Sequence, residues 1–211
     1  MTLEQFFAEN REVAIAFSGG VDSAYLLYAA TRYAARVKAY YVSTAFQPEF
    51  ELADARRLAD ELGADMLVLH VDVLSNSAVT ANPSDRCYHC KNTLFRQILR
   101  AAENDGFPVL LDGTNASDDA GDRPGMRALQ ELSVRSPLRE CGLTKAEIRR
   151  LSREAGLFTW DKPAYACLAT RIRTGEEITL QKLKQTEKAE GFLFGLGFRD
   201  FRVRMVDNTA K

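Results

Sequence analysis

Histidine is scarce in this chain of 211 residues, and neither sign of charge is in excess. The two histidines, His70 and His89, are too few for a histidine-rich zinc site or for several independent histidine-based catalytic centres. Lysine and arginine together number 28, against 29 for aspartate and glutamate, so no bulk charge attracts nucleic acid or a membrane surface. We therefore expect neither nucleic acid nor a membrane among the partners.

Long apolar runs and a secretion signal are also missing. No apolar stretch approaches the length of a membrane span, and residues 1–6 are amphipathic and acidic, without a basic n-region or an apolar h-region. We therefore expect a cytoplasmic protein. In that compartment its four cysteines favour metal or redox chemistry over structural disulfides.

Strand-like and helix-like segments alternate along most of the chain. Strands are predicted at residues 12–17, 37–44, 64–71, 108–111 and 134–138, and helices at 22–35, 48–62, 86–103 and 144–155. This order predicts a Rossmann-like α/β fold, in which a parallel sheet carries helices on both faces. Ligands of such folds bind at the carboxyl ends of the strands.

The last quarter of the chain changes character. A lysine- and glutamate-rich helix is predicted at residues 180–194 and a short strand at 201–206. We therefore predict a main domain at residues 1–160 and a small C-terminal lobe at 161–211. The predicted strand ends close to residue 211, which raises the question whether the lobe is complete.

The most informative stretch follows the first predicted strand and leads into the first helix. It reads Ser18-Gly19-Gly20-Val21-Asp22-Ser23. Backbone amides and the dipole of a helix N-terminus attract anions, glycines let a phosphate approach, and the two serine hydroxyls add donors. Asp22 suits a Mg²⁺ ion bound together with a polyphosphate. An ordinary turn with a serine N-cap is the alternative.

The loop is not a Walker A loop, because no Gly-Lys-Ser/Thr follows its glycines. It resembles the PP-loop, SGGxDS, of the N-type ATP pyrophosphatases, which cleave ATP between the α and β phosphates and adenylate an acceptor. Further stretches narrow the resemblance, namely residues 82–91, 111–118, 136–138, 143–145 and 162–171. Together with the loop they resemble the LarE family of ATP-dependent sulfur transferases over residues 12–204.

The resemblance implies a reaction, its cofactors and an assembly. A carboxylate of pyridinium-3,5-biscarboxylic acid mononucleotide would be adenylated and converted to a thiocarboxylate, on the route to the nickel-pincer nucleotide cofactor of lactate racemase. ATP and Mg²⁺ would be used, AMP and pyrophosphate released, and the chain would form hexamers. The small C-terminal lobe would serve sulfur transfer or substrate binding.

Two groups of polar residues are candidates for binding. The first follows the strand at 108–111 and could face the nucleotide, although its members are also normal turn residues: Asp112, Thr114, Asn115 and Asp118. Ser136 is a weaker candidate near the same edge. Arg86 and Lys91 could hold phosphate, but we favour solvated charges at a helix end.

The second group lies in the C-terminal lobe. Arg202 and Arg204, two residues apart, would project from one face of a strand and could grip the phosphate of a mononucleotide. The alternative is a charged guard on an exposed edge strand. The resemblance favours substrate binding by these arginines together with Glu190 and Arg171.

Cys167 is the first candidate for the sulfur donor. Arg171 follows four residues later, so on a helix the guanidinium would lie on the same face and lower the pKa of the thiol. The alternative is a small buried apolar residue. Adenylation turns a carboxylate into an electrophile with AMP as leaving group, which a thiolate or sulfide can then displace. The resemblance favours Cys167 in this role.

Cys87 and Cys90 form a Cys-x-x-Cys pair that suits a metal or redox chemistry. With Cys167 they would supply three ligands to a 4Fe–4S cluster and leave one iron open to bind sulfide. Some relatives resemble this arrangement, whereas others give up the sulfur of one cysteine and end with dehydroalanine. Zinc and a disulfide stay open as alternatives, while Cys141 has no partner pattern and is interpreted as structural.

Two competing functions are compatible with the loop. A tRNA thiolase or another PP-loop adenylating ligase would share it, but a thiolase usually needs a basic RNA-binding surface, which this chain lacks. A nucleotide sensor or iron–sulfur scaffold would bind ATP without catalysis. Release of pyrophosphate separates an enzyme from a sensor.

Overall fold

Four parallel strands form the centre of the fold in the computed structural model, which describes residues 1–118, 124–206 and 209–211. Their order in the sheet is β3-β2-β1-β4, with Val13 of β1 opposite Val37 and Val109. The strands are β1 (Glu12–Ala16), β2 (Arg36–Ser43), β3 (Asp65–His70) and β4 (Val109–Leu111). The predicted parallel α/β sheet is confirmed.

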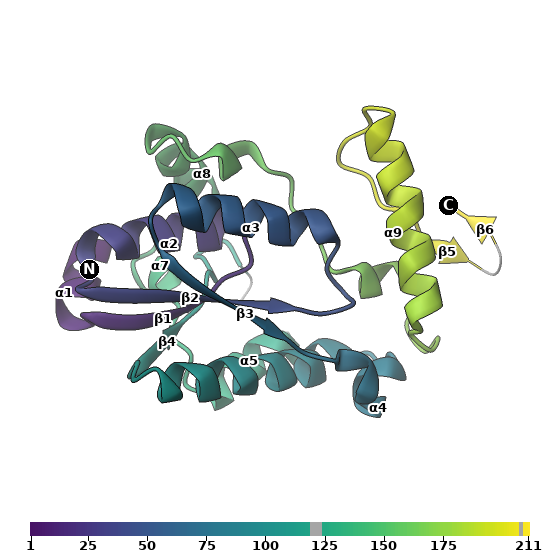
Figure 1. Cartoon of the computed structure of the whole chain (residues 1–211), viewed down its shortest axis with the longest axis horizontal. Coiled ribbons are helices and arrows are strands. Elements are labelled where there is room, and N and C mark those ends of the chain that lie inside the picture. Colours follow the sequence, from purple (N-terminus) through teal and green to yellow (C-terminus); the bar gives the residue numbers. More distant parts are fainter. Residues whose placement is uncertain (119–123, 207–208) are drawn as a thin grey trace.

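Helices cover both faces of this sheet (Figure 1). One face carries α1 (Leu3–Glu9), α2 (Val21–Tyr33), α3 (Glu49–Glu61), α7 (Pro137–Glu140) and α8 (Lys145–Glu154). The other carries α5 (Arg86–Asn104), with α6 (Pro124–Glu131) packed on it. Side chains alternate along a strand, so Ile15 enters the first core and Ala14 the second. No helix in the described ranges is both long and apolar enough to cross a membrane.

The C-terminal part lies beyond the carboxyl ends of the strands (Figure 1). It contains η3 (Leu168–Arg171), α9 (Leu180–Gly195), β5 (Met205–Val206) and β6 (Thr209–Ala210), whereas η2 (Phe158–Asp161) still packs on α8 and α2. Leu168, Ile172 and Leu183 share a core with Phe46, which follows β2, and with Val79. Val79 belongs to α4 (Ser77–Thr80), which follows η1 (Val73–Ser75) after β3. This shared core holds the C-terminal part against the segments that follow β2 and β3. The predicted division into two domains at residue 160 stays a prediction.

Two predicted strands differ from the structure. In place of a fifth strand at 134–138, only Arg135 bridges to the sheet, opposite Leu111, and Pro137 starts helix α7. Proline has no N–H for a ladder and is well placed in the first turn of a helix. The strand predicted at 201–206 is wrong for residues 201–204, since only Met205–Val206 pairs, antiparallel to Thr209–Ala210.

Candidate active site

The loop at residues 18–23 joins β1 to α2 in a tight turn. Gly20 is the N-cap and Val21 begins the helix. Gly19 has a φ of +71°, and a Cβ there would come within 3.2 Å of Ala55 on α3, so glycine suits this position for two reasons. The hydroxyl oxygens of Ser18 and Ser23 lie 3.0 Å apart. The predicted strand–turn–helix geometry of an anion site is therefore present.

A second glycine, Gly113, packs against the backbone of this loop. A Cβ on Gly113 would lie 2.9 Å from the backbone nitrogen of Ser23, so only glycine lets the two segments approach so closely. Gly113 follows β4 and the loop at 18–23 follows β1, its neighbour in the sheet. Gly113 was not among the site residues that we predicted from the sequence. The one feature of the sequence that could have indicated its role is its position among the polar residues that follow β4.

The polar residues after β4 bond mainly to one another. The carboxylate of Asp112 accepts hydrogen bonds from the hydroxyls of Ser136 (2.6 Å) and Thr114 (2.5 Å). Asn115 donates its N–H to Asp118 (2.9 Å). These side chains therefore stabilise the loop that holds Gly113. Their predicted contact with the nucleotide stays a prediction, and none of them lines the cavity described next.

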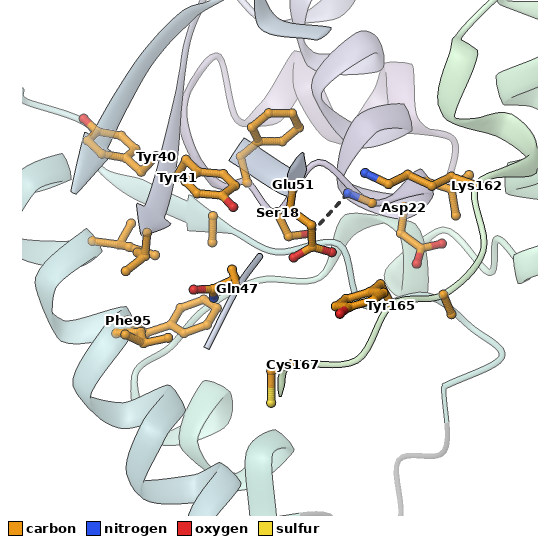
Figure 2. Close-up of a pocket in the computed structure, with 18 of the residues that line it drawn as sticks. Ser18, Asp22, Tyr40, Tyr41, Gln47, Glu51, Phe95, Lys162, Tyr165 and Cys167 are labelled. Atoms are coloured by element: carbon orange, nitrogen blue, oxygen red, sulfur yellow. Dashed lines mark hydrogen bonds between the residues drawn. The ribbon is translucent and has the colours of Figure 1, made fainter. Parts of the chain in front are cut away.

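A cavity of about 390 Å³ opens at the carboxyl end of the sheet (Figure 2). Its volume is within the range typical of small-molecule sites. Its lining comes from six parts of the chain: the loop at 18–23 with Ser18, Gly20, Val21 and Asp22; β2 with Tyr40, Tyr41 and Val42; α3 and the turn before it with Gln47 and Glu51; α5 with Leu94, Phe95 and Ile98; α8 with Lys145; and the C-terminal segment with Lys162, Tyr165 and Cys167. From the sequence we predicted all of the loop residues and, in the C-terminal segment, Cys167.

Asp22 faces this cavity and pairs with Lys145 of α8. Burial raises the pKa of Asp22, although Lys145 partly opposes this. Within the described residues, its second oxygen, Oδ1, is buried and has no hydrogen-bond partner. An unpartnered carboxylate oxygen is a ligand that Mg²⁺ prefers, so the predicted magnesium fits this residue. The backbone of Lys145 is fixed by a hydrogen bond from its N–H to the hydroxyl oxygen of Ser117 (2.9 Å).

Lys162 links the loop to the C-terminal segment. Its Nζ lies 2.7 Å from Asp54 of α3 and donates to the carbonyl oxygen of Gly19 at 3.4 Å. It lines the first cavity and also a second one, of about 680 Å³, which shares the wall formed by residues 162–165. Neither Lys162 nor Lys145 was singled out from the sequence, where each appeared only within a longer stretch.

Glu51 of α3 extends into the first cavity (Figure 2). Burial raises the pKa of this carboxyl to about 7, and Asp54 adds to the effect while Lys162 and Arg171 oppose it. A carboxyl with such a pKa exchanges its proton near neutral pH. Nothing in the sequence marks Glu51 as a site residue, because acidic residues such as Glu49 and Glu51 are common in the first turn of a helix.

Arg202 and Arg204 line the second cavity and are exposed. They lie on one side of the chain with Val203 buried between them, as an alternating segment would place them. Val203 donates its N–H to Glu190 (2.9 Å). The predicted pairing of the two arginines at one site is therefore present, although the segment is not a strand.

Glu190 and Arg171 do not reach either cavity, against the prediction that they bind substrate. They form an ion pair whose side chains are 1% and 0% exposed. Tyr165 also donates to Glu190. Burial would raise the pKa of Glu190, but the bonds from Arg171, Tyr165 and Val203 outweigh it and hold the pKa below its usual range.

Cys167 lines the first cavity and is the N-cap of η3. Arg171 acts on the pKa of this thiol in the predicted, lowering direction, but burial outweighs its effect. Arg171 donates to the carbonyl oxygens of Ala166 (2.6 Å) and Cys167 (3.2 Å), and burial raises the pKa of the thiol. Arg86 favours the thiolate more than Arg171 does.

Comparisons with known proteins agree with this site. Residues 4–119 match the asparagine synthase family. The chain is 32% identical over 212 residues to pyridinium-3,5-bisthiocarboxylic acid mononucleotide synthase of Lactiplantibacillus plantarum, a match covering 100% of this chain and 77% of the relative. The chain belongs to the LarE family. An uncharacterised protein of Synechocystis sp. is 39% identical, with coverage of 99% of this chain and 78% of that relative.

Membership of the LarE family makes the chain an ATP-dependent sulfurtransferase of the PP-loop type. The tRNA thiolase alternative has only distant and partial support. The tRNA-specific 2-thiouridylase of Thermotoga maritima is 26% identical, over 69% of this chain and 52% of that relative. The resemblance inferred from the motifs is thus confirmed.

The other cysteines of this LarE-family chain fall into two groups. Burial raises the pKa of Cys90 to about 12, and the neighbouring Cys167 and Cys87 add to the shift. Cys90 and Cys167 pack against the same apolar core. Even so, no group of three or more histidine, cysteine, aspartate or glutamate side chains in the described ranges is arranged to hold a metal ion. Cys141 is half-buried against the core beneath α2, which agrees with a structural role.

Arg86 is not the solvated helix-end charge that we favoured from the sequence. It is buried at 8% exposure, and its guanidinium donates to Asn82 (2.8 Å) and to the carbonyl oxygen of Ala169 (3.0 Å). Arg86 thereby fixes the start of α5, which carries Cys87 and Cys90, against the η3 segment that follows Cys167. Its cationic group is the main favourable charge beside that thiol.

Proposed function

We propose that the chain converts a carboxylate of pyridinium-3,5-biscarboxylic acid mononucleotide into a thiocarboxylate after adenylating it with ATP. One observation carries the proposal: the loop at 18–23 and Cys167 line the same cavity. A site for a polyphosphate and a sulfur donor therefore face one space. The name of the Lactiplantibacillus plantarum relative supplies the class of product.

The first step would take place at the loop. The amides at the start of α2 and the hydroxyls of Ser18 and Ser23 bind the phosphates, and Lys145 and Lys162 add positive charge beside them. A carboxylate oxygen of the substrate attacks the α-phosphorus, and pyrophosphate leaves with the electron pair of the broken P–O bond. Mg²⁺ at Asp22, when bound, would neutralise charge on the pyrophosphate. Asp112, Thr114, Asn115 and Asp118 support the loop in this step.

The second step would use the Cys167 thiol. Because burial raises its pKa, the thiol is protonated at neutral pH, and it gives up its proton to solvent water as it attacks. Sulfur bonds to the carbonyl carbon, and AMP leaves with the electrons of the C–O bond. Solvent water then takes the Cα proton of Cys167, the C–H electron pair forms the Cα=Cβ bond, and the Cβ–S pair leaves with sulfur, which gives dehydroalanine in the chain and the thiocarboxylate on the product.

A 4Fe–4S cluster on Cys87, Cys90 and Cys167 is the other predicted source of sulfur. The donor chemistry suits such a cluster, and the thiols influence one another's pKa. Their side chains do not converge as a ligand set, so the steps above are derived from Cys167 itself. The sulfur source is decided by experiment.

The decisive experiment is anaerobic purification, iron and sulfide assay, and intact mass before and after turnover with ATP and the dicarboxylate substrate. The proposal expects AMP, pyrophosphate and thiocarboxylate, with a chain one hydrogen sulfide lighter at Cys167. Cys167→Ala should still release pyrophosphate but form no thiocarboxylate, whereas Cys141→Ala should behave as the parent chain. Iron with unchanged mass would assign the sulfur to the cluster, and no pyrophosphate would overturn the proposed reaction.

Three further proposals follow from the resemblance. Arg202 and Arg204 would bind the phosphate of the substrate, the chain would assemble as a hexamer, and it would work in the cytoplasm.

Phe192, Leu196 and Phe198 near the end of α9 are 69%, 60% and 58% exposed, and such apolar surface is suited to self-association. Analytical ultracentrifugation tests the hexamer.

A further inference from the structure

Glu51 carries a carboxyl group that lines the first cavity together with Cys167, and the proposed chemistry has not used it (Figure 2). Within residues 1–118, 124–206 and 209–211, no ion pair and no side-chain hydrogen bond engages this carboxyl. The other carboxyl of the lining belongs to Asp22, which pairs with Lys145 through one oxygen and offers the second to the proposed Mg²⁺. Glu51 is therefore available to a reacting group in the cavity.

The remaining ionisable groups of the described lining are poor proton acceptors. Apart from the two carboxyls and the thiol, they are phenols and ammonium groups: Tyr40, Tyr41, Tyr165, Lys145 and Lys162. Burial raises the pKa of all three phenols, so they stay neutral, and an ammonium group has no lone pair that could accept a proton. Among these side chains, the carboxyl of Glu51 is the one suited to take a proton from the thiol.

Contacts on both sides of Glu51 hold the start of α3 against the segment that carries Cys167. Three of them join residues 46–54 to residues 162–168: the N–H of Leu168 to the carbonyl oxygen of Phe46 (2.8 Å), the ring of Phe50 to that of Tyr165 (centroids 5.3 Å apart) and Asp54 to Lys162 (2.7 Å). Glu51 lies within the first of these two stretches. The guanidinium of Arg171 influences the pKa of both Glu51 and Cys167, which agrees with a common neighbourhood.

We propose that Glu51 is the catalytic base that removes the thiol proton of Cys167 and passes it to solvent water. The proposal rests on the proposed function, because it serves the attack of sulfur on the acyl adenylate. As the S–H bond breaks, its electron pair stays on sulfur, which bonds to the carbonyl carbon, and the proton moves to a carboxylate oxygen of Glu51. Water then takes the proton from Glu51 and restores the carboxylate.

The surroundings of Glu51 suit a base that works near neutral pH. The charged and titratable groups that influence it come from α3, β2, η3 and the segment at 162–165: Asp54, Tyr41, Arg171, Lys162 and Tyr165. Burial raises the pKa of Glu51 to about 7, so the carboxylate is a stronger base than an exposed one and is still present at neutral pH. A base is most effective when its pKa lies near the working pH.

The test needs neither ATP nor the dicarboxylate. Iodoacetamide alkylates a thiol as its proton leaves, and peptide mass spectrometry follows the rate at Cys167 between about pH 6 and pH 9. In the parent chain this rate should rise about tenfold with a midpoint near pH 7, as Glu51 becomes a carboxylate. Glu51→Gln should lower the rate at pH 8 about tenfold and remove this midpoint, which leaves only the rise at higher pH that the thiol itself causes.

The matched control is Glu49→Gln, exposed in the same turn of α3, which should keep the profile of the parent chain. Cys141 serves as a reference in the same molecules, since its alkylation should not depend on Glu51. Thermal unfolding followed by circular dichroism shows that each variant is folded. A profile at Cys167 that folded Glu51→Gln leaves unchanged overturns the inference.

Turnover separates this inference from the proposed function. With ATP and the dicarboxylate, Glu51→Gln should slow thiocarboxylate formation about 100-fold and pyrophosphate release far less. Equal losses in the two products would overturn a role confined to the thiol. A parent chain that releases no pyrophosphate, but whose alkylation midpoint disappears in Glu51→Gln, would overturn the proposed reaction and sustain Glu51 as the base for Cys167.

Discussion

Arg171 and Glu190 form a bidentate ion pair, with N–O distances of 2.8 and 3.1 Å, in which both side chains are excluded from water. The same guanidinium donates to the carbonyl oxygens of Ala166 and Cys167, and the same carboxylate accepts from Val203. One pair therefore fixes the segment that carries Cys167, the helix α9 and the segment that carries Arg202 and Arg204.

Glu190→Gln should destabilise the chain strongly, because it leaves the charge of Arg171 buried without a counter-charge. We expect the free energy of unfolding to fall by about 3 kcal/mol. Urea denaturation measures this change. The matched control is Glu154→Gln, which breaks the exposed Arg150–Glu154 pair and should change stability by less than about 0.5 kcal/mol. Equal small effects would show that the buried pair contributes no more than a surface pair.

The low pKa of Glu190 also gives this pair a pH dependence with a definite sign. Because the folded-state pKa lies below the unfolded value, the stabilisation is present above the unfolded pKa and is lost as pH falls through the folded one. Glu190→Gln should therefore remove part of the acid sensitivity of the parent chain. Urea midpoints measured between neutral and acidic pH test this direction.

Glu51 gives stability a pH dependence of the opposite sign. Its pKa rises from 4.5 to about 7 on folding, so between these values the folded chain holds a proton that the unfolded chain has released. Stability contributed by the protonated carboxyl is thus full below the unfolded pKa and is lost as pH rises towards 7. Tyr41 from β2, Lys162 and Tyr165 from the C-terminal segment, and Asp54 from α3 surround the group.

Glu51→Gln should therefore be more stable than the parent chain at pH 8 by roughly 2 kcal/mol and about equal to it near pH 4.5. Denaturation series at several pH values provide the comparison. Glu49→Gln, exposed in the same turn of α3, should show the slope of the parent chain. A slope that Glu51→Gln leaves unchanged would assign the proton to another group.

Asp22→Asn should lower the rate of pyrophosphate release roughly 100-fold, because it weakens an oxygen ligand of the proposed Mg²⁺ and removes a charge beside Lys145. Titration with Mg²⁺ at fixed ATP should need a higher concentration in this variant. Asp60→Asn, exposed on α3, is the control and should match the parent chain. An unchanged magnesium requirement in Asp22→Asn would place the ion elsewhere.

Local signals explain what the sequence predicted correctly. Each apolar strand, each amphipathic helix and the glycines of the loop can be recognised within a few residues of sequence. The parallel sheet and the tight turn of the loop follow from these patterns. Pro137 was the local signal against a fifth strand, since it begins a helix there. The fold was therefore largely predictable from short windows of sequence.

The rest of the site depends on contacts between distant residues. Lys162 reaches Gly19 across 143 positions, and nothing in its own neighbourhood marks it. Glu190 lies on a helix rich in lysine and glutamate, a pattern that predicts a surface residue. In the structure it is buried, because it pairs with the buried Arg171. Arg86 was misread for the same reason, because its partner Ala169 lies 83 positions away.

Gly113→Ala should damage the loop at 18–23 without unfolding the chain. The new Cβ would lie 2.9 Å from the nitrogen of Ser23 and 3.2 Å from its Cα, both of them backbone atoms, so the first turn of α2 must shift. A displacement of phosphate-binding amides by a few tenths of an ångström should weaken ATP binding about tenfold or more, measured by calorimetry. Gly195→Ala is the control, because nothing lies within 4 Å of its added Cβ at the end of α9. It should leave ATP binding unchanged, and an equal loss in both variants would mean that the contact between Gly113 and Ser23 does not shape the loop.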